Sequence, residues 1–157
     1  MLFVTRYEDV VSLKTRLKKT GADRSGWISE YLDPVTNERW FDVYQDVDGR
    51  MPTILRRADL PQDLGQLIHE ALTSPREDDW YGLAVYFNSE GVDAEQLFSV
   101  LTTKRGDLIP SALKAFGRAL ELPDKRHITG MTIAEVDSSY KRYLFLKGEI
   151  KKLTNGV

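Results

Sequence analysis

The side chains with the clearest chemical potential are three consecutive carboxylates, Glu77, Asp78 and Asp79, which precede Trp80 and Tyr81. Paired carboxylates perform general acid–base catalysis when their environments differ, because one must keep a proton while the other is ionised. Adjacent residues in a polar loop seldom have such different environments. The triplet therefore favours a binding role over a catalytic one.

Other groups have the composition of a metal or nucleophilic site but not the spacing. His69 and His127 are the only histidines and cysteine is absent, so neither a histidine pair nor a thiolate site is expected. Residues 46–49 (DVDG) begin like a calcium loop, but that alignment puts Tyr44 at the first ligand position and Leu55 at the twelfth, where carboxylates are needed. No G-x-S-x-G turn or glycine-rich phosphate loop is present. We expect no metal, no cofactor and no catalytic set.

Charge is segregated along the chain. Residues 26–98 contain fifteen Asp and Glu against five Arg and no Lys, whereas residues 1–25 and 99–157 carry net charges of +3 and +5. The acidic segment also holds all three tryptophans and ten of the sixteen aromatic residues. Carboxylates beside aromatic anchors suit a surface that binds a basic partner. Alternatively, the aromatic residues form the core and the carboxylates a solvated face.

Length and composition indicate one soluble globular domain covering residues 1–157. The chain is 41% hydrophobic and 29% charged, and no apolar run approaches the ~20 residues of a membrane-spanning helix. The opening Met1–Val4 is followed at once by charged residues, which is too short for the apolar region of a signal peptide. The absence of cysteine fits a reducing compartment. We therefore expect a cytoplasmic protein with no membrane partner.

Helices are expected where apolar residues recur three and four positions apart, over residues 6–20, 62–73, 93–104 and 110–121. Thr5 and Glu8 form a T-x-x-E capping box before the first of these. A second T-x-x-E, at Thr132 and Glu135, predicts a long C-terminal helix. Alternation over residues 140–146 leaves a strand as the alternative for this segment.

Strands are expected in the aromatic and β-branched runs at residues 27–32, 39–45, 53–55 and 80–88. The first three form an antiparallel meander, and the last, apolar on both parities, is predicted to be a central strand buried on both faces. The fold class is therefore α+β, a single domain with an antiparallel sheet of about four strands and helices packed mainly on one face.

One face of the second strand combines aromatic and acidic residues. Trp40, Asp42 and Tyr44 alternate onto this face, so they either lie under another element or form a binding surface. The candidate partner-binding residues are this group with the neighbouring carboxylates: Trp40, Asp42, Tyr44, Asp46, Asp48, Glu77, Asp78 and Asp79. If this face is not the interface, the basic C-terminal third is the next candidate. Nucleic acid is not expected there, because the acidic sheet would repel it.

Four short segments carry a family resemblance: Trp27-x-x-x-Tyr31, the turn at 33–37, the run at 39–44 and the triplet 79–81 (DWY). With these segments, the chain resembles the immunity proteins of bacterial polymorphic-toxin systems, in particular those paired with contact-dependent inhibition nucleases. The resemblance implies a cytoplasmic inhibitor that binds a basic toxin domain and blocks its active site. It implies no particular architecture, because immunity families differ in fold.

Two other functions stay open at this point. One is a small enzyme or enzyme accessory subunit whose site is assembled by the fold from Asp42, Glu70, Asp78, Asp79 and His69. Two of these carboxylates converging in a concave pocket would favour that function. The other is a regulatory protein that binds a partner unrelated to toxins.

Overall fold

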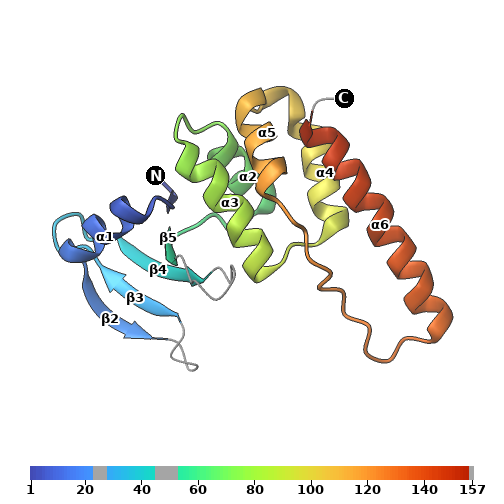
Figure 1. Cartoon of the computed structure of the whole chain (residues 1–157), viewed down its shortest axis with the longest axis horizontal. Helices are drawn as coiled ribbons and strands as arrows, with labels where there is room; N and C mark the ends of the chain where they lie inside the picture. The colour runs from blue at the N-terminus through green and yellow to red at the C-terminus, as the bar shows by residue number, and fades with distance from the viewer. Residues whose placement is uncertain (23–27, 45–52, 156–157) are drawn as a thin grey trace.

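The computed structural model describes residues 1–22, 28–44 and 53–155, with the backbone alone for Tyr44 and Thr53. Its strands form one antiparallel sheet in the order β1-β5-β4-β3-β2 (Figure 1). They are β1 (Phe3–Val4), β2 (Lys18–Ala22), β3 (Ser29–Leu32), β4 (Arg39–Tyr44) and β5 (Thr53–Arg57). The predicted α+β class is confirmed, and the described residues form a sheet of five strands rather than about four.

A tight turn joins β3 to β4, as residues 33–37 predict. The Asp33 N–H donates to the Glu38 carbonyl, and the Asn37 N–H donates to the Asp33 carbonyl, both at 2.8 Å. Asn37 has a φ of 60°, in the left-handed region that asparagine tolerates better than most residues. Because β4 pairs in turn with β5, the predicted meander is confirmed.

Helix α1 (Tyr7–Arg16) covers one face of the sheet. Its buried residues Val10 and Leu13 pack against Trp40 of β4 in a small hydrophobic core. Spacing of three residues places both side chains on the same side of the helix, so the helix meets the sheet with one apolar stripe.

The predicted helix over residues 6–20 is too long. The chain leaves the helix at Leu17 and continues as β2, which pairs with β3. The N-cap residue is Arg6, and its side chain makes no capping hydrogen bond. Thr5 instead donates from Oγ1 to the carboxylate of Asp78, so this T-x-x-E is not a capping box. A tertiary contact has replaced the local one.

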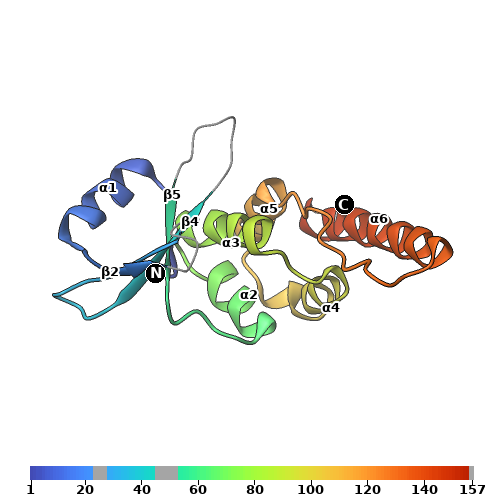
Figure 2. The same cartoon turned by 90° about the horizontal axis from the view of Figure 1, so that it is seen from below.

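The remaining helices lie on the opposite side of the sheet and beyond it: α2 (Leu64–Leu72), α3 (Glu77–Glu90), α4 (Ala94–Lys104), the 3-10 helix η1 (Arg105–Asp107), α5 (Pro110–Ala119) and α6 (Ile133–Asn155). Helix α3 lies next to the sheet, whereas α4, α5 and α6 lie farther away (Figures 1 and 2). Helices thus cover both faces, with most of them on one. None of the helices in the described part of the chain is both long and apolar enough to cross a membrane.

The predicted central strand at residues 80–88 is wrong, because this segment is part of α3. An apolar run of this length does not distinguish a buried strand from a buried helix. The flanking residues do: three carboxylates occupy the first turn, and Gly91, with a φ of 87°, ends the helix. The helix approaches β1 so closely that a Cβ on Gly82 would lie 2.3 Å from Cβ of Phe3.

Helix α6 confirms the predicted C-terminal helix and its capping box. The Thr132 hydroxyl accepts from the Glu135 N–H at 3.3 Å, and the Glu135 carboxylate accepts from the Thr132 N–H at 2.7 Å. Its last turns pack tightly on α5, where a Cβ on Gly117 would lie 2.1 Å from Oγ1 of Thr154. Its first turns extend beyond α4 and α5 (Figures 1 and 2).

Candidate interaction surface

The acidic aromatic face predicted for β4 is covered by α1. Trp40 is fully buried and Asp42 is 3% exposed. Asp42 accepts from the hydroxyl of Tyr31 at 3.1 Å and pairs with Lys14 of α1 at 2.7 Å. Trp40 and Asp42, two of the predicted partner-binding residues, are therefore not accessible to a partner. The side chain of Tyr44, and Asp46 and Asp48 as a whole, lie outside the described residues.

The carboxylate triplet has mainly an internal role. Asp79 is buried; its Oδ1 accepts from the backbone N–H groups of Leu2 at 2.7 Å and Phe3 at 2.9 Å. Asp78 accepts from the N–H of Thr5 at 3.2 Å. Of the triplet, only Glu77 projects into solvent. Asp78 and Asp79 thus hold β1 to the first turn of α3, and they do not border the face of Trp40 as predicted.

Five of the nine other described carboxylates of the acidic segment pair with arginines of the same chain. The ion pairs are Arg16–Asp33, Arg39–Glu30, Arg57–Glu38, Arg57–Asp59 and Arg142–Glu95. Hydrogen bonds from Arg142 hold the pKa of Glu95 below its ordinary value, and those from Arg57 do the same for Asp59. Part of the negative charge that is concentrated in the sequence is therefore offset by arginines of the folded chain.

The residues of the enzyme alternative are divided among three elements: Asp42 on β4, His69 and Glu70 on α2, and Asp78 and Asp79 on α3. His69 and Glu70 lie on the exposed side of α2, where Glu70 accepts from Gln66 at 2.8 Å. Asp42 lies under α1, and Asp79 lies between α3 and β1. Within the described ranges, no three His, Asp or Glu side chains are grouped so that they could hold a metal ion. The three cavities lined entirely by described residues include none of these carboxylates.

Exposed apolar side chains gather instead at the C-terminal end of the fold. Six of the eleven exposed large hydrophobic residues in the described chain lie between residues 128 and 145. We call them the α6 apolar surface: Ile128, Met131, Ile133, Tyr140, Leu144 and Phe145. Ile133 is 91% exposed, and Leu144 and Phe145 are about half exposed. Spacings of seven and four residues place Ile133, Tyr140 and Leu144 on one side of α6.

The connection between α5 and α6 is fixed by hydrogen bonds from two helices. Asn88 of α3 accepts from the Glu121 N–H at 2.9 Å. Leu122 has a φ of 50°, and its carbonyl accepts from the Tyr143 hydroxyl at 2.6 Å and from Lys147 at 3.3 Å. These contacts hold the backbone of Leu122 in the left-handed region, a conformation that is unfavourable for leucine by itself. The segment that leads into the α6 apolar surface is therefore positioned by the fold.

Arg126 joins this connection to α6. Its guanidinium donates to both carboxylate oxygens of Asp124, at 2.7 and 2.8 Å, and to the Ser139 hydroxyl at 3.0 Å. The hydrogen bonds with Asp124 raise the pKa of Arg126 and lower that of Asp124. The guanidinium carbon also lies 5.1 Å from the ring centre of Tyr140 and 5.6 Å from that of Tyr143. Arg126 thus fixes a ring of the α6 apolar surface.

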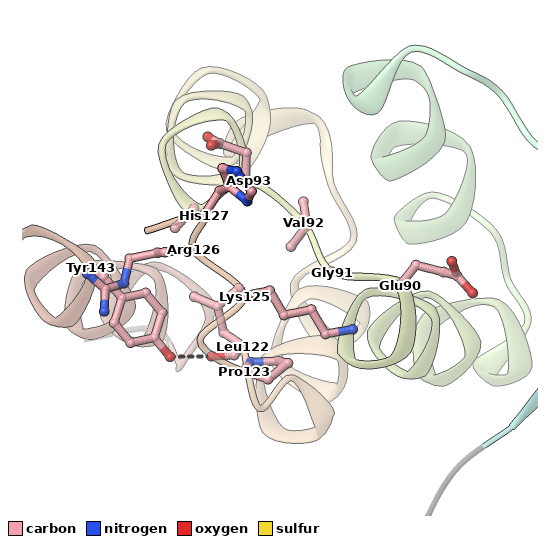
Figure 3. A pocket seen from close by; sticks show the side chains of 11 residues that line it. Glu90, Gly91, Val92, Asp93, Leu122, Pro123, Lys125, Arg126, His127 and Tyr143 are labelled. Atoms are coloured by element: carbon pink, nitrogen blue, oxygen red, sulfur yellow. Dashed lines mark hydrogen bonds between the residues drawn. The ribbon is translucent and has the colours of Figure 1, made fainter. Parts of the chain in front are cut away.

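A cavity of about 400 Å³ lies beside this surface, between the end of α3, the start of α4, the connection and α6 (Figure 3). Its charged lining residues have both signs: Lys125 and Arg126 face it together with Glu90 and Asp93. Lys125 donates to the carbonyl of Ser89, and Asp93 caps α4. Lys125, Arg126 and Asp93 thus have partners within the chain, and the charges lining the cavity have both signs, so the cavity favours neither an anion nor a cation.

Neither a protein-family model, nor a curated protein, nor a solved structure matches this chain. The case for the α6 apolar surface therefore rests on the structure. A sequence signal was available for it: Tyr143, Leu146 and Ile150 form the buried stripe of the helix, whereas Tyr140 and Leu144 lie on a second apolar stripe. One helix with two apolar stripes has more apolar surface than one packing contact requires.

Proposed function

We propose that this chain acts by binding another protein, and that the partner docks on the α6 apolar surface. The observation that carries the proposal is the concentration of exposed large hydrophobic residues on one helix and the connection before it. Contiguous apolar patches on otherwise polar monomers mark interaction sites. Immunity to a bacterial toxin, which the sequence resemblance implies, is the specific form of this proposal.

The surface has the features of an energetic centre for binding. Aromatic residues dominate the free energy of many interfaces, and Tyr140 and Phe145 are both exposed here. The ring of Tyr140 stacks at 6.2 Å on that of Tyr143 and contacts Arg126. Because the ring is already held in place, binding costs little of its rotational freedom.

The charge of α6 indicates what the partner presents. Its sequence contains five basic and three acidic residues, so the complementary surface is apolar with acidic residues at its rim. This differs from the basic partner surface that the acidic segment suggested. The proposal therefore keeps the toxin inhibitor and places its interface on the C-terminal third of the chain.

The test measures, by isothermal titration calorimetry, binding to a toxin domain, which the immunity proposal predicts to be encoded by the neighbouring reading frame. We expect the double substitution Leu144→Ser/Phe145→Ser to weaken binding at least about tenfold, since buried interface aromatics often contribute 2 kcal/mol or more. Val35→Ser is the matched control, because Val35 is 78% exposed on the β3–β4 turn. If the double variant and Val35→Ser lose the same affinity for the toxin domain, the interface is elsewhere.

Two further measurements separate the forms of the proposal. Co-expression of the chain with the toxin domain should restore bacterial growth, and the double variant should not. If the parent chain binds the toxin domain but does not restore growth, the inhibitory role is wrong and the protein-binding role is kept. Sedimentation velocity tests whether a second copy of the chain occupies the surface. If the parent chain forms a stable dimer and Leu144→Ser/Phe145→Ser dissociates it, the surface binds a second copy of the chain, and the proposal of a different partner is refuted.

A further inference from the structure

Arg56 differs from every other arginine in the described part of the chain. Each of the others either pairs with a carboxylate or is exposed, as Arg105 and Arg118 are. Arg56 is half-buried, and among the described residues no carboxylate forms an ion pair with it. Its neighbour Arg57, in contrast, pairs with both Glu38 and Asp59. Partial burial of an unpaired charge is costly, so its surroundings must stabilise it.

Two aromatic rings provide this stabilisation. Arg56 lies opposite Phe41 in the register of β5 and β4, and its guanidinium carbon is 4.7 Å from the Phe41 ring centre. The same carbon is 5.4 Å from the ring centre of Tyr86 on α3. Aromatic rings stabilise a cation through the face of the guanidinium. The N–H groups in the guanidinium plane stay available for other partners.

Few of those N–H groups are used within the chain. The hydrogen bond that the structure shows runs from Nη1 of Arg56 to the carbonyl of Arg57, at 3.3 Å. The planar fork of an arginine matches a carboxylate with two parallel hydrogen bonds. The guanidinium is therefore held in a fixed orientation with donors that a ligand can use.

Arg56 lines a cavity of about 490 Å³, a size typical of small-molecule sites. The cavity lies between the sheet and helices α2, α3 and α4. Its lining is mixed: polar groups are accompanied on one side by the apolar side chains of Leu60, Pro61, Leu64, Leu67 and Phe87. Asp93 also lines it, but its Oδ1 accepts from the Gln96 N–H at 2.9 Å as the cap of α4.

We propose that this cavity binds a small organic carboxylate with an apolar body, and that Arg56 receives the carboxylate with its guanidinium fork. The aliphatic wall contributed by α2 and the segment before it holds the apolar body. The site is separate from the α6 apolar surface, so a test of this proposal does not depend on whether the protein-binding role is correct.

The first test uses the unaltered protein and three probes: benzoate, its neutral analogue benzamide, and inorganic phosphate. Each is titrated while the Arg56 side-chain N–H and the backbone amides of Phe41 and Tyr86 are followed by NMR. We expect saturable shifts with benzoate at millimolar concentration, and binding of benzamide at least about tenfold weaker, because it lacks the charge-assisted hydrogen bonds. Phosphate should also bind more weakly, because it has no apolar body.

Some outcomes of this titration would overturn the proposal. Equal binding of benzamide and benzoate would remove the role of the guanidinium. Phosphate binding as tight as benzoate would remove the role of the apolar wall. Shifts that do not saturate, or that occur at other residues, would remove the site. None of these results depends on a variant that must fold.

The second test compares substitutions of two unpaired arginines. Arg56→Gln should weaken benzoate binding at least about tenfold, and Arg118→Gln, on the exposed side of α5, should leave it unchanged. Arg56→Lys keeps the charge without the planar fork, so intermediate binding is expected. Thermal melts show whether each variant folds. Unchanged benzoate affinity in a folded Arg56→Gln protein would contradict the proposal.

Discussion

The ammonium group of Lys14 lies 2.7 Å from Oδ1 of Asp42, in the contact between α1 and β4. Burial by itself would lower the pKa of Lys14, but the hydrogen bond and the charge of Asp42 outweigh it and raise this pKa above its ordinary value. The pair is thus stabilised by its geometry, while Asp42 alone in this position would be a buried, uncompensated charge.

We expect Lys14→Met to lower the free energy of unfolding by about 3 kcal/mol, because it leaves the Asp42 carboxylate buried without a cation. Urea denaturation at neutral pH measures this. Replacing both residues, in Lys14→Met/Asp42→Leu, should restore most of the loss, since it removes the stranded charge. Lys19→Met on exposed β2 is the control. A single variant as stable as the parent would mean that the pair is not buried in solution.

The turn carboxylate Asp33 makes stability depend on acidic pH. Hydrogen bonds from the Val35 N–H and from Arg16 hold the pKa of Asp33 below its ordinary value of 3.8. A carboxyl whose pKa is lower in the folded state stabilises fully above its unfolded pKa and loses this effect as pH falls through the folded pKa. We therefore expect the urea concentration at the unfolding midpoint to decrease as the pH is lowered below about 4. Asp33→Asn should show a shallower acid dependence; an identical profile would assign the effect to other carboxylates.

Asp79 and Glu77 occupy the same turn of α3 but differ in their contacts. Asp79→Ala should destabilise the protein by about 3 kcal/mol, because it leaves the buried N–H of Phe3 without an acceptor. Glu77→Ala should change stability by no more than about 0.5 kcal/mol, since its side chain is exposed and lies 3.7 Å from Arg6. Thermal melts of the two variants side by side give the comparison. Similar shifts would exclude the specific role of Asp79.

Two helical glycines should respond to alanine with opposite signs. Gly148 in α6 has nothing within 4 Å of a new Cβ, so Gly148→Ala should stabilise the protein by about 1 kcal/mol through helix propensity. Gly82→Ala should destabilise it, because its Cβ would lie 2.3 Å from Cβ of Phe3 and the strand must move. Chemical denaturation measures both. A stabilised Gly82→Ala protein would show that β1 does not pack there.

Local patterns were sufficient for much of the fold. The β3–β4 turn, the meander and the capping box of α6 depend on contacts within a few residues, and the sequence predicted all three. The α3 error shows the limit of this approach. Residues 80–88 are apolar on all sides because β1, α2 and α5 surround the helix, and only its acidic first turn and Gly91 indicated a helix.

The candidate site was harder to predict. Alternation placed Trp40 and Asp42 on the same face correctly, but it could not show that α1 would cover that face. Nor could the sequence show that Arg56 would lie between rings from β4 and α3, because these contacts join residues far apart in the chain. Burial of a particular side chain is a property of the assembled fold.

The attachment of β1 to α3 has a consequence for synthesis on the ribosome. Phe3 is made before its hydrogen-bond acceptor on Asp79, which lies 76 positions later in the chain. At about 5–20 residues per second, that interval lasts about 4–15 s. Strand β1 lacks its partner β5 until Arg57 has been made, and it lacks helix α3 for the whole interval. Strand β1 therefore leaves the ribosome well before the helix that holds it, and chaperones that bind nascent apolar chains would meet it in that interval.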